Sequence, residues 1–369
     1  MALAARRWTR RQILATGVAV NLLADDQKGT VYPADWRRYA DPATELDVYR
    51  LTDPAYTSTL PPYYSRPVAR RSAFLLFCCD RGGSPQAFRM DLKTGESVQL
   101  TNAQKLDGNS LSLLPDNRAV AYFDDRALQL INLANLRERE VYSVPDGWQR
   151  CAGVSASGDG SFVAFGERQG ETSRLRIVPL ARGSARTIAE APFEIQDPIA
   201  RPGRAQMLFR DGDRALWLVN HDGGQKRQLR LAPGRVGPAN WAPDGRTVLY
   251  LRFPEERSQL NEIREHTPDS GTDKLVAKTS QFAHFGFNRD TSVFIGASRN
   301  AASPTVLLLL RITRREFTLC EHKASAPAMV EPLFSPDAQR VFFESDRHGK
   351  PAIYCVHVEK LVEKIETES

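Results

Sequence analysis

A phrase of turn residues followed by an alternating apolar run recurs along this chain and restricts its fold more than any other feature. The clearest copy, FSPDAQRVFFESDRHGKPAIYCVHV at residues 334–358, holds a turn, an apolar strand, a second turn and a second apolar strand. Alternation with a period of two, punctuated by Gly, Pro and Asp, is typical of β-hairpins. The other copies of the turn begin at Ala69, Leu114, Ala156, Ala200, Ala242 and Asn288. Their spacing of roughly 41 to 47 residues is the period of four-stranded propeller blades, so we predict seven blades.

A propeller also needs a way to join its first and last blades. Residues 45–52, ELDVYRLT, form an extra strand with the outer-strand ending RLT ahead of the first full blade, whereas the last blade has only three clear strands. We therefore expect the N-terminal strand to complete the last blade, because this leaves no sheet edge unpaired. The predicted fold is all-β: one seven-bladed β-propeller over residues 29–360, after a leader at 1–28 and before a charged tail at 361–369.

The leader predicts where the protein is found. Residues 9–14, TRRQIL, are close to the twin-arginine export pattern, and an apolar stretch follows at 13–24. A dozen apolar residues are too few to span a bilayer but suit a signal sequence, so we expect no stable membrane span. Periplasmic export is the favoured interpretation. A basic amphipathic tail on a cytoplasmic protein is the alternative.

Charge, cysteine spacing and the motifs found in the sequence limit the classes of function to consider. The net charge of +6 is compatible with an acidic ligand, although a solvated basic surface is the commoner explanation. The five cysteines show no metal-binding spacing and are interpreted as small apolar residues rather than disulfide partners. The chain also contains no nucleophile elbow, P-loop, dinucleotide-binding glycine motif or HExxH motif.

Ligands of propellers bind over the central channel, so the stretches just ahead of each turn phrase are the places to search. Together these stretches supply Tyr63, Tyr64, Arg66, Gln196, Asp197, His284 and Glu331. Aromatic rings and guanidinium groups suit a carboxylated sugar, which stacks on rings and pairs with arginine. Single-stranded nucleic acid uses a similar set, and any one of these residues could serve blade packing instead. These residues alone are compatible with either class of ligand.

Several stretches resemble the bacterial oligogalacturonate lyases. They are the phrase at 334–354, RRYADPATELDVYRLTDP at 37–54, AFRMDLKTGESVQLT at 87–101 and ALWLVNHDG at 215–223. The resemblance runs from about residue 29 to 358. It implies a seven-bladed propeller that cleaves short galacturonate oligomers of pectin by β-elimination. The expected partner is therefore an acidic oligosaccharide, and no nucleic acid is expected. It also implies a bound divalent metal, usually Mn²⁺, beside the substrate carboxylate.

Matched position by position, the resemblance implies roles for five residues. Arg214, just before WLVN, corresponds to the arginine to which the family assigns the base role. Tyr64 and Arg66 match an aromatic and basic pair of the substrate-binding face. His284 matches one metal-binding histidine, and Glu331 is the only residue at the remaining ligand positions that could still bind a metal.

The metal site departs from the family pattern. Ala326, Met329 and Glu331 stand where the family has a glutamine and two histidines. This departure leaves open a second hypothesis, a non-catalytic periplasmic propeller that binds sugar acids or a protein partner. The first hypothesis, an oligogalacturonate lyase-like enzyme, accounts for more of the chain.

Overall fold

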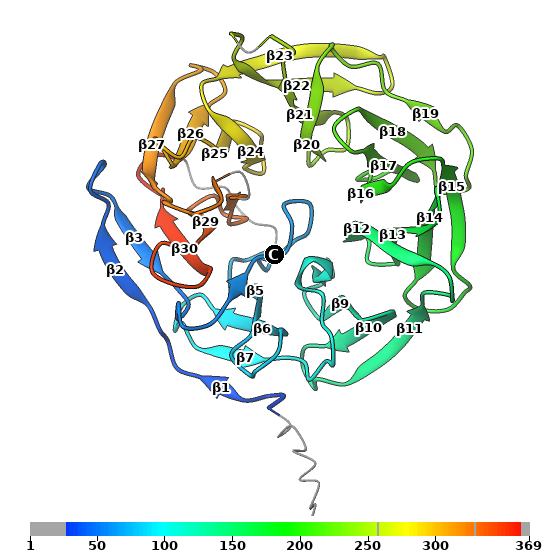
Figure 1. Ribbon diagram of the computed structural model, residues 1–369, viewed down its shortest axis with the longest axis horizontal. Coiled ribbons are helices and arrows are strands. Elements are labelled where there is room, and N and C mark those ends of the chain that lie inside the picture. Colours follow the sequence, from blue (N-terminus) through cyan, green and yellow to red (C-terminus); the bar gives the residue numbers. More distant parts are fainter. Residues whose placement is uncertain (1–26, 257, 328–329, 363–369) are drawn as a thin grey trace, which may run out of the picture.

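Thirty strands form seven antiparallel sheets arranged as blades in a ring (Figure 1). Cavities lie where the innermost strands of the blades meet, along the central channel of the ring. The computed structural model describes residues 27–256, 258–327 and 330–362, and the count of strands refers to those residues. The predicted seven-bladed β-propeller is thereby confirmed. Nearly all of the predicted leader and most of the charged tail lie outside the described residues, so their boundaries stay predictions.

Each blade has four core strands, numbered outward from the channel. The first blade consists of β4 (Ser58–Thr59), β5 (Phe74–Cys79), β6 (Gln86–Asp91) and β7 (Ser97–Gln99). The second consists of β8 (Ser112–Leu113), β9 (Ala119–Asp124), β10 (Ala127–Asn132) and β11 (Glu138–Ser143). The third consists of β12 (Gln149–Ala156), β13 (Phe162–Gln169), β14 (Thr172–Pro179) and β15 (Arg186–Ala191). The fourth blade consists of β16 (Ile195–Ala200), β17 (Gln206–Asp211), β18 (Ala215–Asn220) and β19 (Arg227–Gln228). The fifth consists of β20 (Arg235–Trp241), β21 (Val248–Phe253), β22 (Asn261–Thr267) and β23 (Thr272–Thr279). The sixth consists of β24 (Phe282–Phe287), β25 (Val293–Ser298), β26 (Thr305–Leu310) and β27 (Glu316–Glu321).

The seventh blade closes the ring as the sequence predicted. Its strands β28 (Leu333–Phe334), β29 (Arg340–Ser345) and β30 (Ala352–His357) are completed by β3 (Asp47–Arg50), which pairs with β30. Two further strands were not predicted. β2 (Arg37–Ala40) adds a fifth strand outside β3, and β1 (Val31–Tyr32) pairs with β7 outside the first blade. The N-terminal segment therefore ties the last blade to the first.

The hydrophobic core lies between the blades, because alternating side chains of each strand point to opposite sheet faces. On β9, Val120 and Tyr122 pack against the first blade, whereas Ala121 and Phe123 pack against the third. Among the described residues, seven clusters each draw their side chains from two adjacent blades. All five cysteines are free and buried, as expected of small apolar residues.

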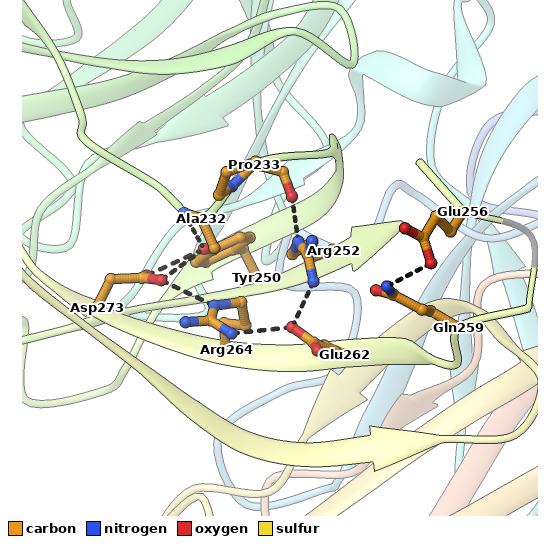
Figure 2. A network of polar contacts seen from close by, with 9 residues as sticks. All are labelled: Ala232, Pro233, Tyr250, Arg252, Glu256, Gln259, Glu262, Arg264 and Asp273. Carbon is orange, nitrogen blue, oxygen red and sulfur yellow. Dashed lines mark hydrogen bonds and ion pairs between the residues drawn. The ribbon is translucent and has the colours of Figure 1, made fainter. Parts of the chain in front are cut away.

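Polar groups also hold strands together within the fifth blade (Figure 2). Glu262 on β22 accepts hydrogen bonds from Arg252 at 2.8 Å and from Arg264 at 2.9 Å. Arg264 also donates to Asp273 on β23, which accepts a bond from the hydroxyl of Tyr250. Burial alone would raise the pKa of Glu262, but its two arginine partners outweigh burial and lower it.

The innermost strand of the first blade is interrupted, and this interruption shapes the channel. β4 pairs with the end of β5, and Val68 forms an isolated bridge to Leu75. The intervening residues 60–67 contain three prolines, which cannot donate to a strand ladder. This segment leaves the sheet and reaches into the middle of the ring as the blue loop ahead of β5 (Figure 1). Its Tyr63 and Tyr64 line the cavities enclosed by the blades.

Candidate functional site

One mouth of the channel opens into a cavity of about 710 Å³, called the charged cavity. The first residues of the innermost strands and the last residues of the second strands line it. Its acidic side chains are Asp107, Asp197, Asp213, Glu331 and Glu344. Its basic side chains are Arg150, Arg210, Arg235, Arg299 and His284. A cavity of this size, with convergent groups of both signs, is large enough for a small oligosaccharide.

Irregular pairing directs several of these side chains into the cavity. The innermost strands of blades three to six each have a register shift near their start, between Arg150 and Val154, Gln196 and Ile199, Val236 and Ala239, and Phe282 and His284. Such bulges bend a strand and re-aim its side chains, and they are common beside binding sites. Gly153, at φ +95°, lies in the first of them. A Cβ there would come within 2.7 Å of the backbone nitrogen of Asp197, so glycine permits β12 to approach β16.

His284 and Glu331 meet in the charged cavity. The Nδ1 atom of His284, on β24, lies 3.2 Å from Oε1 of Glu331, which precedes β28. The backbone N–H of Tyr63 donates to the other carboxylate oxygen of Glu331 at 3.2 Å. Burial raises the pKa of Glu331 to about 7. Because the two side chains keep 22% and 31% of their exposure, a ligand can reach them.

A second polar group forms the floor of the cavity. Arg210, at the end of β17, pairs with Asp197 at 3.0 Å, and the hydroxyl of Tyr63 lies 3.5 Å from the same Asp197 oxygen. The rings of Tyr63 and Tyr64 are in edge contact, with centroids 5.0 Å apart. Burial raises the pKa of Asp197, although the ion pair with Arg210 opposes this shift. Arg210 is thus already neutralised by a carboxylate of the protein.

Glu344 is a third buried acid at the cavity wall. Its carboxylate accepts a hydrogen bond from the backbone N–H of Leu60, at the start of the loop that enters the channel. Burial, with a smaller contribution from the nearby charge of Glu331, raises the pKa of Glu344 to about 8. The cavity therefore holds carboxyl groups that stay protonated at higher pH than ordinary glutamates.

The rim of the cavity presents two arginines on one aromatic ring. The guanidinium carbon of Arg299 lies 4.7 Å from the centroid of Phe253, and that of Arg235 lies 5.6 Å from it. Arg235 also pairs with Asp213 at 3.3 Å. Within the described part of the chain, Arg299 has no carboxylate at ion-pair distance. Its positive charge is therefore available to an acidic ligand.

The structure brings together only some of the residues that the sequence singled out. His284, Glu331 and Tyr64 line the charged cavity. Arg214 lies on the turn between β17 and β18, next to the lining residue Asp213, where it is 71% exposed and ion-paired with Asp211. Arg66 lines a different cavity at the opposite mouth of the channel. The roles expected for Arg214 and Arg66 stay predictions.

The sequence search missed the residues at the ends of the second strands. Arg210, Phe253, Arg299 and Glu344 all stand at this place in their blades and line the charged cavity. The stretches searched were those ahead of the innermost strands, yet the turn after each second strand faces the same mouth. The sequence does contain a signal for these positions. A charged residue follows the apolar part of a second strand in MLFRD, GASRN and VFFES.

Comparisons with known proteins agree with this architecture. The family model described as oligogalacturonate lyase matches residues 26–169. An oligogalacturonide lyase of Pectobacterium atrosepticum and an oligogalacturonate lyase of Dickeya dadantii are each 25% identical to this chain, over 90% of it and 98% of the relative. A solved structure described as oligogalacturonate lyase in complex with manganese superposes with a TM-score of 0.84 at 26% identity, covering 89% of this chain and 98% of that one. The Vibrio parahaemolyticus oligogalacturonate lyase structure gives a TM-score of 0.83 at 24% identity, over 90% and 98%.

Fold and site together define a seven-bladed propeller with a charged pocket over its channel. The similarity to curated lyases and to their solved structures extends over almost the whole length of both partners. By these matches, the chain is similar in sequence and in fold to the oligogalacturonate lyases over almost its whole length.

A relative with bound manganese raises the question of whether this chain could hold such an ion. His284 and Glu331 offer one imidazole nitrogen and one carboxylate oxygen, which are donor types that first-row dications accept. Among the described residues, no group of three or more His, Cys, Asp or Glu side chains could share an ion, and Met329 lies outside them. The residues present thus fit a two-ligand site, in which water or substrate oxygens would complete the coordination.

No helix in the described part of the chain is long and apolar enough to cross a membrane.

Proposed function

We propose that this protein cleaves short galacturonate oligomers by β-elimination, as an oligogalacturonate lyase-like enzyme. The observation that carries the proposal is a match to such lyases over nine tenths of the chain, combined with a charged cavity at the channel mouth. This coverage favours the enzyme over a propeller that merely binds sugar acids.

Substrate recognition is assigned to the arginines of the rim. Arg299 stacks on Phe253 and keeps its charge unneutralised, so a uronate carboxylate can pair with it. Burial lowers the pKa of Arg299, and the charge of Arg235, which lies on the same ring, lowers it by a smaller amount. An anion between the two guanidinium groups would relieve this repulsion. The exposed face of a sugar ring would lie toward Tyr63 and Tyr64 on the cavity floor.

The reaction requires removal of the proton on C5, which is acidified by the adjacent carboxylate. As that proton leaves, its electron pair forms the C4=C5 double bond, the C4–O bond breaks, and the departing oxygen takes up a proton. We assign to Arg214 the role that the family resemblance implies, that of taking or polarising the C5 proton. In its ion pair with Asp211, the Arg214 guanidinium stays protonated. Acting as a base would therefore require this pair to open, whereas polarising the carboxylate would not.

A divalent cation, with Mn²⁺ as the expected ion, is assigned to His284 and Glu331. When bound, it would neutralise charge that develops on the substrate carboxylate. Two protein ligands hold an ion weakly, so occupancy should depend on the concentration of free metal and on substrate. The hydrogen bond from the Tyr63 N–H fixes the orientation of the Glu331 carboxylate toward His284.

The place of action is proposed from the twin-arginine pattern at Arg10 and Arg11. Export of the folded protein to the periplasm would expose it to short oligomers that enter the cell envelope. Replacing both arginines by lysine and fractionating the cells tests this. Wild-type protein is expected in the periplasmic fraction and the variant in the cytoplasm.

The activity test uses purified protein, digalacturonate and Mn²⁺, with ultraviolet absorbance of the unsaturated uronate as the signal. The wild type is expected to generate this absorbance, and His284→Ala and Arg214→Ala are expected to reduce its rate. A wild type that binds digalacturonate in calorimetry yet forms no unsaturated product would support the non-catalytic alternative instead.

A further inference from the structure

The opposite mouth of the channel contains a second cavity, of about 370 Å³, called the opposite cavity. It is lined by the last residues of the innermost strands and by the turns that follow them. Tyr63 and Tyr64 line both cavities and so form the partition between them. The two cavities are therefore separate sites on one channel.

The charges of the opposite cavity differ from those of the charged cavity. Within the described part of the chain, the charged residues that line it are Arg66 and Arg289, and both are cationic. No aspartate or glutamate lines it, among the residues that the structure describes. The positive charge of Arg66 inside this cavity therefore favours an anion.

Arg66 is the group that such an anion would meet. Its Nη1 atom is buried and has no hydrogen-bond partner within the described residues. Nor does any described carboxylate lie at ion-pair distance from it. Burial lowers the pKa of Arg66, and the neighbouring charge of Arg70 lowers it further. Arg66 as a whole is half-buried, and a half-buried guanidinium without a counter-charge is less favourable than a paired one, so a bound carboxylate would reduce that cost.

Aromatic side chains form part of the remaining wall of the cavity, together with prolines and serines. Tyr64, Trp241, Phe285, Phe287 and Phe334 contribute to the lining. Several of the hydroxyl groups around them already have protein partners; for example, Ser155 donates to the backbone oxygen of Pro198. A ligand held in this cavity would thus present a flat or apolar body to the aromatic rings and its charge to Arg66.

We propose that the opposite cavity binds a small monocarboxylate, whose carboxylate pairs with Arg66 and whose body packs on the aromatic wall. The size of the cavity suits a ligand no larger than a monosaccharide acid, near the lower end of the roughly 300–1,000 Å³ range of ligand pockets. The site does not depend on His284 or Glu331, and the proposal stands independently of the elimination reaction.

Calorimetric titration of the full-length protein with benzoate and with galacturonate tests the proposal. Benzyl alcohol and glucose serve as uncharged counterparts. One benzoate per chain is expected to bind, and benzyl alcohol at least tenfold more weakly. Arg66→Met should weaken benzoate binding by about 10- to 100-fold, the range for loss of a charged hydrogen-bond partner. Arg66→Lys should retain part of the affinity.

Two controls locate the binding site. Arg70→Met removes a neighbouring charge that does not line the cavity, and it should change benzoate affinity less than threefold. His284→Ala, in the charged cavity, should also leave benzoate binding intact. A measurement on the wild type needs no variant: benzoate should protect Arg66 from an arginine-specific dicarbonyl reagent, as followed by peptide mass. The proposal is overturned if the wild type binds no benzoate, if Arg66→Met binds it unchanged, or if benzoate fails to protect Arg66.

Discussion

Replacing Arg299 by glutamine should weaken substrate use because this arginine is the unneutralised cation at the rim of the charged cavity. A hydrogen bond to a charged partner is worth about 1.5–3 kcal/mol. Arg299 is exposed and only its stacked face lies on Phe253, so solvent screening favours the lower part of that range. A loss of about 1.5–2 kcal/mol corresponds to a decrease of roughly 10- to 30-fold in kcat/KM for digalacturonate. Steady-state kinetics at low salt measures it, and the decrease should shrink as salt is added.

Arg315→Gln is the matched control for this experiment. Arg315 is also an exposed arginine on a phenylalanine, at 5.2 Å from the ring of Phe317, but it lies at the β26–β27 turn and outside the cavity. It should change kcat/KM less than twofold. Equal effects of the two substitutions, or no effect of Arg299→Gln, would refute the assignment of the rim arginine to substrate binding.

Three further predictions concern stability. The folded-state pKa of Glu344, about 8, exceeds its ordinary 4.5, so the folded protein keeps a proton that the unfolded chain has lost, and stability falls as pH rises between these values. Glu344→Gln should therefore become more stable than the wild type as pH rises, by about 2–4 kcal/mol in the free energy of unfolding at pH ~8.5, as measured in urea. A difference between the two proteins that does not change with pH would contradict the assignment. Glu262→Ala leaves Arg252 and Arg264 without their shared carboxylate and should cost about 2–3 kcal/mol, whereas an unchanged melting temperature would show that the network adds nothing. Gly153→Ala should cost more than about 2 kcal/mol, because its φ and the nearby backbone of β16 both exclude a Cβ; a variant as stable as wild type would contradict this.

The fold was predictable because its signal is local and repeated. Each blade contains the same turn chemistry and the same alternation, so seven weak signals support one another. The closure by residues 45–52 was also accessible, since a blade with three strands needs a fourth. The pairing of β1 with β7 was not, because a two-residue strand has no periodicity and its partner lies 60 residues away or more.

The site was less predictable because its geometry depends on contacts between blades. His284 and Glu331 were expected to share a site, and the structure places them 3.2 Å apart. Arg66 follows Tyr64 by only two residues, yet it lines the other cavity, because the loop at 60–67 passes through the channel and its side chains reach both mouths. No local pattern reports such a crossing. The bulges that aim Arg150 and Asp197 depend equally on partners in neighbouring strands.

Mass analysis of the products of digalacturonate tests the central claim most directly. Elimination yields one galacturonate and one unsaturated monomer that is lighter by one water, whereas hydrolysis yields two galacturonates. The account predicts the unsaturated monomer in equal amount to galacturonate, with the wild-type protein and Mn²⁺. Two saturated galacturonates, or intact digalacturonate after prolonged incubation with folded protein, would contradict it.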